Sequence, residues 1–385
     1  MRSRTRYAFA GKTGFDEKLA KFHWPLLAAM SLVLILSVLT LFSAGHNGDS
    51  FGGWRPYALD QLIKILVGLG VFFIAAFSNI RTWLKSVWTI YGIALALIIL
   101  VTFVGHTGMG ATRWINLGFV HIQPSEFIKI ALILAFAKYF SWKNSVESGQ
   151  LRTYLIPLAI LGAPLVFILA QPDLGTAISI TLAGIGVFWA AGARRQWFAI
   201  AAALFILAAP IVWFAGLHDY QRERIITFVH PDQDLAGTGY QINQSKITFG
   251  SGGVYGKGYL QGTQSHMYFL PEKQTDFIFA IFGEEFGFAG AMVLILIYSA
   301  MTGILFWISK QSKNRFGQLF CFGFMLNFSI YYFINIFMVL GLLPTVGVPL
   351  PLMSFGGSAL ISLMLGLGIC QNCNINRDQL LANKG

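Results

Sequence analysis

The amino-acid sequence predicts an all-α polytopic integral membrane protein with about ten transmembrane helices and one large ordered outward loop. Of the 385 residues, 56% are hydrophobic and only 11% are charged, whereas a soluble domain carries roughly a quarter charged residues. Apolar runs long enough to cross a bilayer recur along the chain. Clusters of Lys and Arg fill alternate gaps between these runs, so the net charge of +11 does not indicate a nucleic acid partner.

We expect one membrane domain over residues 1–385, with a leader at 1–24 and a tail at 372–385. The first apolar run is too long for a signal peptide and lacks a small-residue cleavage site, so we expect it to be an uncleaved span. The predicted spans lie near 25–43, 60–77, 86–104, 124–140, 154–170, 174–191, 197–215, 277–308, 317–340 and 354–371.

The basic gaps predict the orientation of the chain. Short cytoplasmic loops carry an excess of Lys and Arg. We therefore expect both termini in the cytoplasm, which an even number of spans requires. The residues that mark these gaps are Arg81, Lys85, Lys143, Arg152, Arg194, Arg195, Lys310, Lys313 and Arg315.

The long stretch 216–275 falls outside by this rule, between the seventh and eighth spans. It contains aromatic and apolar residues that disordered segments lack, so we expect it to be ordered against the membrane surface. Outward loops usually carry few cations, yet this one includes Lys246 and Lys257. This excess suggests attraction to lipid headgroups or to a phosphorylated ligand. The glycine-rich run 250–258 would let the backbone approach a ligand closely.

Charged residues inside a span are costly and need a reason. Glu126 and Lys129 are three residues apart on the fourth span, so they share one helix face and can pair. They form either a neutralised structural pair or part of a polar cavity in which Lys129 faces an anion. In the loop before this span, Arg113 offers a planar set of donors suited to phosphate. Trp114 beside it would rest at the interface or against an isoprenoid chain; on spacing alone, an interfacial anchor pair is the simpler interpretation.

Two outward aspartates precede predicted helices. Asp173 suits an N-cap of the sixth span. Thr275 or Asp276 could cap the eighth span. Alternatively, Asp276 is a positioned, ionised carboxylate at the membrane surface that takes a proton from a hydroxyl. Cys370 and Cys373 form a lone CxxC motif without a second pair, so we expect no metal there.

Several long stretches of the chain together resemble the SEDS family of cell-wall polymerases, and its elongation branch more than its division branch. The resemblance covers essentially the whole sequence. Its most specific stretches are 110–118, 123–126, 171–176, 240–258, 262–279 and 343–357.

This resemblance implies a peptidoglycan glycosyltransferase of the bacterial cytoplasmic (inner) membrane. Its substrate would be lipid II, a disaccharide-pentapeptide on undecaprenyl pyrophosphate. Its partners would be a class B penicillin-binding protein transpeptidase and other proteins of the elongation machinery. Asp276 matches the family's essential loop aspartate, which makes it the expected general base.

The remaining candidates follow from the charge of the leaving pyrophosphate. We expect substrate binding by Arg113, Trp114, Glu126, Lys129, Lys246 and Lys257, while Asp173, Gln123, Ser125 and Thr275 are structural or of uncertain role. No cofactor is certain; a divalent cation such as Mg²⁺ or Mn²⁺ could assist at the pyrophosphate, although no ligand cluster marks a site.

Three other interpretations stay open at this point. A lipid II flippase or other lipid-linked sugar transporter would use Glu126, Lys129 and Asp173 as a polar path through the membrane. A scaffold that only recruits a transpeptidase would not need Asp276. The division paralogue FtsW would have the same chemistry in a different cellular role.

Overall fold

The computed structural model describes residues 14–46, 57–104, 106–108, 111–116, 121–143, 150–171, 173–211, 213–214, 219–230, 237–266 and 272–379. The expected leader and tail extend beyond these ranges at 1–13 and 380–385. The helices are α1 (Phe15–Ala20), α2 (Trp24–Gly45), α3 (Ala58–Phe77), α4 (Ile80–Val104), α5 (Pro124–Ser141), α7 (Arg152–Ala170), α8 (Leu174–Ala191), α9 (Arg195–Ile211), α10 (Asp219–Val229), α11 (Thr238–Ser251), α12 (Thr263–His266), α13 (Ile278–Gln311), α14 (Arg315–Val339) and α15 (Gly357–Ile375). Three short strands, β1 (His106–Gly108), β2 (Ala111–Asn116) and β3 (His121–Ile122), pair in antiparallel order between α4 and α5.

Helices are found at all ten positions where spans were predicted. In the described ranges, eight helices are long and apolar enough to cross a membrane, namely α2, α3, α4, α7, α8, α13, α14 and α15. The other two are α9, which is apolar but 17 residues long, and α5, which contains Glu126, Lys129 and Lys138. All ten begin and end within a few residues of the predicted bounds, apart from the start of α4, which lies six residues earlier.

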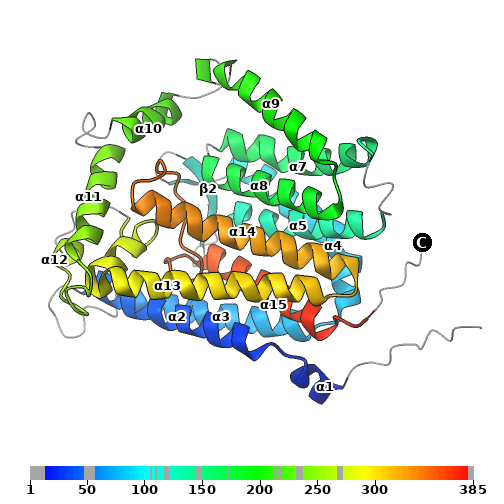
Figure 1. The fold of residues 1–385 in the computed structure, drawn as a ribbon, viewed down its shortest axis with the longest axis horizontal. Coiled ribbons are helices and arrows are strands. Elements are labelled where there is room, and N and C mark those ends of the chain that lie inside the picture. Colours follow the sequence, from blue (N-terminus) through cyan, green and yellow to red (C-terminus); the bar gives the residue numbers. More distant parts are fainter. Residues whose placement is uncertain are drawn as a thin grey trace, which may run out of the picture.

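The spans other than α9 form one bundle in which α14 lies against α5, α8 and α13, and α15 lies against α3, whereas α9 lies to one side of it (Figure 1). Small residues permit the closest of these approaches: a Cβ at Gly368 of α15 would lie 2.5 Å from the carbonyl oxygen of Phe72 in α3. Helix α5 is buried on nearly all sides by α4, α8 and α14. It can therefore carry charged side chains that never meet lipid.

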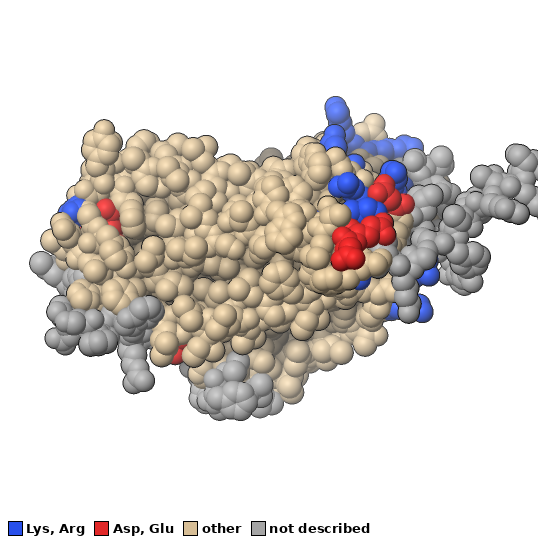
Figure 2. All heavy atoms as spheres, turned by 90° about the horizontal axis from the view of Figure 1, so that it is seen from below, with Lys and Arg blue, Asp and Glu red and all other residues tan. Residues whose placement is uncertain are grey.

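Most of the expected cytoplasmic cations lie at one end of the bundle, which we call the basic end. Lys313 is 2.8 Å from Asp378, and Lys21 is 3.9 Å from the same carboxylate. Arg315 donates hydrogen bonds to the carbonyls of Lys143 and Ala191. Charged side chains gather at this end of the surface, while the middle is almost free of them in this view (Figure 2).

Helix α13 is interrupted near its other end. Gly287 has a φ of 68°, which frees the backbone groups on either side of it. The glycine-rich run satisfies them through backbone hydrogen bonds. The N–H groups of Lys257 and Gly258 donate to the backbone carbonyls of Glu284 and Glu285, and the N–H of Phe288 donates to the carbonyl of Gly253. The glycine-rich run therefore packs its backbone closely against the backbone of α13.

The described part of the long loop is folded, as expected. It contains α10, α11 and α12, and α11 packs against α13. Ile242, Ser245 and Thr248 of α11 are buried. The loop therefore covers the start of α13 and forms the wall beside Asp276.

Candidate active site

Asp276 lies in a turn at residues 272–277, directly before α13, and the residue is half-buried. Three hydrogen bonds from other segments hold the turn. Asn335 Nδ2 donates to the carbonyl of Asp276 (2.8 Å), Ser354 Oγ donates to that of Thr275 (2.6 Å), and Phe355 N–H donates to that of Gln274 (2.9 Å). The carboxylate is therefore carried on a fixed backbone.

Asp276 and Thr275 do not cap α13, so the expected cap is wrong. The N-cap position is Phe277, and no side chain there accepts a hydrogen bond from the helix. Thr275 Oγ1 instead bonds to the carbonyl oxygen and carboxylate of Glu272 within the turn. The carboxylate of Asp276 therefore does not cap the N-terminus of α13.

A second segment lies against Asp276. Gly347 has a φ of 69°, and a Cβ at this position would lie 3.5 Å from Oδ2 of Asp276. Asn335 also donates to the carbonyl of Val348 (2.7 Å). One buried amide of α14 thus joins the segment 344–350 to the turn that carries Asp276.

Charged groups from four elements surround this carboxylate. Burial raises the pKa of Asp276 to about 6; the nearby Glu272 and Asp173 also raise the pKa, whereas Arg224 and Arg113 lower it. A carboxylate with such a pKa is ionised at neutral pH yet basic enough to accept a proton.

The two arginines are held by carbonyl groups of the protein. Arg113 of β2 donates from Nε to the carbonyl of Gln171 (3.1 Å), and its Nη1 lies 3.9 Å from Oδ1 of Asp173. Arg224 of α10 donates to the carbonyl of Thr345 (3.1 Å). These bonds orient the guanidinium groups, whose planar set of donors suits a phosphate.

Asp173 caps α8, as expected. It accepts hydrogen bonds from the N–H (3.2 Å) and the hydroxyl (2.8 Å) of Thr176. Its charge also acts on Lys129 and Tyr331 further inside the bundle. The charge of Asp173 therefore acts both on the carboxylate of Asp276 and on the buried groups of the bundle.

The expected pairing of Glu126 and Lys129 is confirmed. Lys129 Nζ lies 2.6 Å from Oε1 of Glu126, and each residue is 3% exposed. Lys129 also donates to the hydroxyl of Tyr331, and Ser362 Oγ lies 3.4 Å from the other oxygen of Glu126. The pair is closed by protein, and the two cavities described by the structure lie elsewhere.

The other residues singled out from the sequence lie around this network or apart from it. Trp114 follows Arg113 on β2 and is half-buried. Gln123 donates its N–H to Ser358 Oγ (3.0 Å), and Ser125 is buried on the first turn of α5. Lys246 of α11 is exposed.

Lys257 makes a contact that the sequence did not suggest. Its Nζ lies 2.6 Å from Oε1 of Glu284, a carboxylate with no exposed surface. The same oxygen also accepts from the N–H of Gln264 (2.8 Å). Lys257 thus neutralises a buried charge beneath the glycine-rich run.

Four residues of the site were not recognised from the sequence as site residues. They are Arg224, Glu272, Tyr331 and Asn335. A buried Asn inside an apolar span was a usable signal for Asn335, because polar groups in spans need partners.

The described residues also bear on the suggested cation. Nowhere in the described ranges do three or more His, Cys, Asp or Glu side chains converge as metal ligands. The acidic groups nearest Asp276 are instead accompanied by arginines. This donor set does not fit a protein-bound divalent cation, and we derive no step through one.

The fold defines a polytopic membrane protein whose polar network lies at one end of the helix bundle. The chain belongs to the FtsW, RodA and SpoVE family, described as cell cycle proteins, whose family model matches residues 17–379. The resemblance to SEDS proteins is thereby confirmed.

Similar proteins and structures agree with this family. The chain is 40% identical over 355 residues to the peptidoglycan glycosyltransferase MrdB of Escherichia coli K12, covering 92% of this chain and 94% of that protein. It is 34% identical to MrdB of Helicobacter pylori, with 91% and 90% covered. The rod shape determining protein RodA of Thermus thermophilus matches with a TM-score of 0.69 and 26% identity over 93% of this chain and 98% of that one. A chain from a peptidoglycan synthase complex that coordinates polymerization and crosslinking matches with a TM-score of 0.78 and 27% identity, covering 93% and 99%.

Proposed function

We propose that this protein is a peptidoglycan glycosyltransferase of the RodA (MrdB) type that polymerises lipid II, with Asp276 as the general base. One observation carries the assignment of the base. Asp276 is a half-buried residue on a rigidly held turn, its carboxylate feels the positive charge of Arg113 and Arg224, and it has no helix-capping role.

The proposed reaction is a single displacement. The 4-hydroxyl of the acceptor sugar attacks the anomeric carbon of the donor while its proton passes to a carboxylate oxygen of Asp276. The bond between that carbon and the pyrophosphate oxygen breaks, and undecaprenyl pyrophosphate leaves with the electron pair. Attack on an α-linked donor inverts the carbon and gives a β linkage.

The arginines suit the leaving group. Pyrophosphate gains negative charge as the bond breaks, and guanidinium donors aimed at that charge stabilise the transition state. Arg113 and Arg224 are the two described cations whose charge lowers the pKa of Asp276. Lys129 lies deeper and is already paired, so we assign it to the electrostatic support of Asp173 and Tyr331.

The expected location and partner fit the same proposal. The basic end would face the cytoplasm by the positive-inside rule, with both termini there and Asp276 on the opposite side of the cytoplasmic (inner) membrane. A class B penicillin-binding protein is the proposed partner. The supporting observation is the likeness to a chain from a complex that couples polymerization with crosslinking.

The transporter interpretation depends on the charges inside the bundle. Glu126, Lys129 and Asp173 are each 3% exposed and are bonded to protein groups. A transport path would require these contacts to open, whereas the polymerase uses a carboxylate that is already accessible.

The decisive experiment is polymerisation of labelled lipid II by the purified protein with its transpeptidase partner in detergent. We expect glycan ladders from the native chain and at least a hundred-fold fewer products from Asp276→Asn, in line with the loss of a general base. The matched control is Asp378→Asn at the basic end, which should polymerise normally. Full activity of Asp276→Asn would refute the assignment of the base, and no ladder from a folded native complex would refute the activity.

A further inference from the structure

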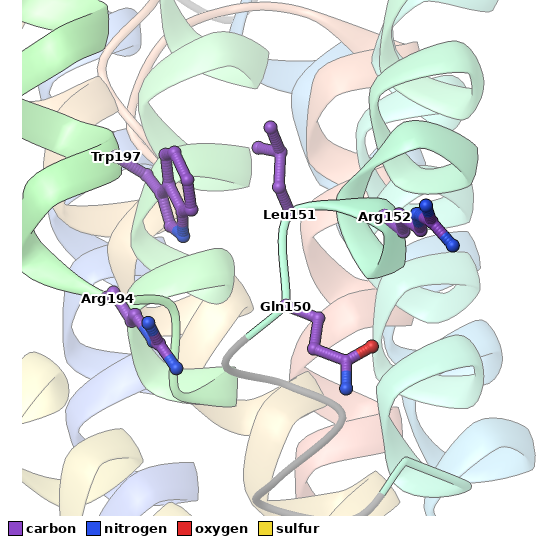
Figure 3. A pocket seen from close by; sticks show the side chains of 5 residues that line it. All are labelled: Gln150, Leu151, Arg152, Arg194 and Trp197. Atoms are coloured by element: carbon purple, nitrogen blue, oxygen red, sulfur yellow. The ribbon is translucent and has the colours of Figure 1, made fainter.

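The two arginines of a cavity at the basic end point away from each other. The cavity has a volume of about 400 Å³ and lies between the start of α7 and the connection from α8 to α9. The side chains of Arg152 and Arg194 lie on opposite sides of it, so they do not meet at one anion (Figure 3). Polar side chains converge instead inside the bundle, where α5, α8 and α14 pack together.

The hydroxyl of Tyr331 is the point at which these three helices meet through polar groups. Tyr331 belongs to α14 and is 3% exposed. Its hydroxyl accepts a hydrogen bond from Lys129 of α5. It also has side-chain hydrogen-bond contacts with Thr176 and Ser179 of α8. One phenol group therefore joins the buried ion pair of α5 to the first two turns of α8.

The hydroxyl protons determine the direction of these bonds. Each hydroxyl has one proton to donate. Thr176 donates its proton to Oδ2 of Asp173 (2.8 Å). Ser179 donates its proton to the carbonyl of Gly175 (2.8 Å). Since neither proton is left for Tyr331, the Tyr331 hydroxyl donates its own proton to one of these two oxygens.

Thr176 is the better acceptor of the two. Its proton is bonded to a carboxylate, whereas the proton of Ser179 is bonded to a neutral carbonyl, and a hydroxyl that donates to a charged group is the more strongly polarised. The bonds then run in one direction, from the ammonium group of Lys129 through Tyr331 and Thr176 to Asp173. Because this chain begins at a cation and ends at an anion, each bond strengthens the next.

The chain ends beside an arginine of the candidate active site. Oδ1 of Asp173, a residue that is 3% exposed, lies 3.9 Å from Nη1 of Arg113. Arg113 also donates from Nε to the carbonyl of Gln171 (3.1 Å). A change in the position of the Asp173 side chain would therefore change the electrostatic field that acts on this guanidinium group.

We propose that Tyr331 is a positioning residue for pyrophosphate binding, because its hydroxyl connects Lys129 to Asp173 and thereby fixes the charge that orients Arg113. This inference rests on the proposed function, in which Arg113 binds the pyrophosphate of the lipid. Without the hydroxyl, Lys129 would keep its ion pair with Glu126 but lose its connection to Asp173.

Binding of undecaprenyl pyrophosphate to the purified full chain in detergent tests this role without requiring catalysis. Tyr331→Phe keeps the ring and removes only the hydroxyl. We expect its Kd for this lipid to rise about five- to ten-fold, the effect of one hydrogen bond in a charged network. Binding of undecaprenol, which has no pyrophosphate, should not change.

The next hydroxyl of the chain provides a second pair of variants. Thr176→Val removes the donor to Oδ2 of Asp173 and should raise the Kd as Tyr331→Phe does. Thr176→Ser keeps this donor and should bind as the native chain does. The matched control is Tyr332→Phe, at the neighbouring buried tyrosine whose ring stacks on that of Tyr298; it should also bind as the native chain does.

A double-mutant cycle tests whether the effect passes through Arg113. Arg113→Gln alone should weaken binding, and Tyr331→Phe added to it should weaken binding no further. An equal further loss in that background, or native affinity in Tyr331→Phe, would overturn the role of Tyr331. A native chain that does not bind undecaprenyl pyrophosphate would overturn it together with the assignment of Arg113, whereas the glycan ladders test the polymerase activity separately.

Discussion

Asn335 in the membrane-spanning helix α14 donates one hydrogen bond to the carbonyl of Asp276 and another to that of Val348. The position of the proposed base therefore depends on an amide 59 residues further along the chain. The loop and α13 alone therefore do not fix the position of this carboxylate, because one of its anchors lies in α14.

Replacement of Asn335 tests this dependence. Asn335→Leu removes both hydrogen bonds and leaves the carbonyls of Asp276 and Val348 without these donors. We expect the free energy of unfolding to fall by roughly 1–3 kcal/mol. Polymerisation should fall about ten- to hundred-fold, because misplaced catalytic groups are costly. The control is Asn327→Leu, at another buried Asn of α14; an equal loss there would indicate general damage to the helix.

The pH dependence of polymerisation should report Asp276. Since the pKa of Asp276 is raised to about 6, kcat/KM should fall as the pH drops through that value and the base becomes protonated. Glu272→Gln removes the largest charge effect that raises this pKa, so the fall should move to lower pH. The other charged groups around Asp276 are Arg224 on α10, Arg113 on β2 and Asp173 before α8, and all are retained.

Glu223→Gln is the control for this profile, because Glu223 is an exposed acid of α10. Glu223→Gln should leave the fall of kcat/KM at low pH unchanged. An unshifted fall in Glu272→Gln would show that Glu272 does not act on the base.

The same shift predicts a stability effect. The folded state holds the proton of Asp276 more tightly than the unfolded state, so this group stabilises the fold at low pH. The contribution is lost as the pH rises from the ordinary value of 3.8 through about 6. Asp276→Asn should therefore raise the Tm at pH 8 while abolishing activity. An unchanged or lower Tm at pH 8 would contradict the raised pKa.

Gly347→Ala should impair the site through backbone strain beside Asp276. The φ of 69° disfavours any side chain, and the added Cβ would lie 3.5 Å from Oδ2 of Asp276. We expect a cost of about 1–2 kcal/mol from the conformation and a clear loss of polymerisation. Gly92→Ala in α4, where nothing lies within 4 Å, is the control that should remain active.

A double substitution distinguishes the two roles of Lys257. Lys257→Met leaves Glu284 buried and unpaired, which should destabilise the protein by about 3–5 kcal/mol. Adding Glu284→Gln should restore much of the Tm measured in detergent. If polymerisation recovers with it, Lys257 is structural; a stable but inactive double variant would support the substrate-binding role expected from the sequence.

The fold was largely predictable because its determinants are local. Span lengths follow from bilayer thickness, and the basic gaps follow from the charge rule. The pairing of Glu126 with Lys129 follows from helix geometry alone. The site was less predictable because its contacts are long-range: Arg224, Asn335 and the pairing of Lys257 with Glu284 join segments that no local pattern relates. The sequence also suggested a cap at Asp276, because the bonds from Asn335 and Ser354 that help to hold the turn before Phe277 come from distant segments.

The backbone hydrogen bonds between the glycine-rich run and the interrupted part of α13 have a consequence for biosynthesis. Residues 252–289 contain both halves of that contact, so this unit can close as soon as it has left the ribosome. The anchors of Asp276 come from Asn335 and Ser354, which are synthesised later. In a nascent chain that ends before α14, the contact between the glycine-rich run and α13 could therefore form while the carboxylate of Asp276 still lacked its anchors. The site would become complete only in the last part of translation.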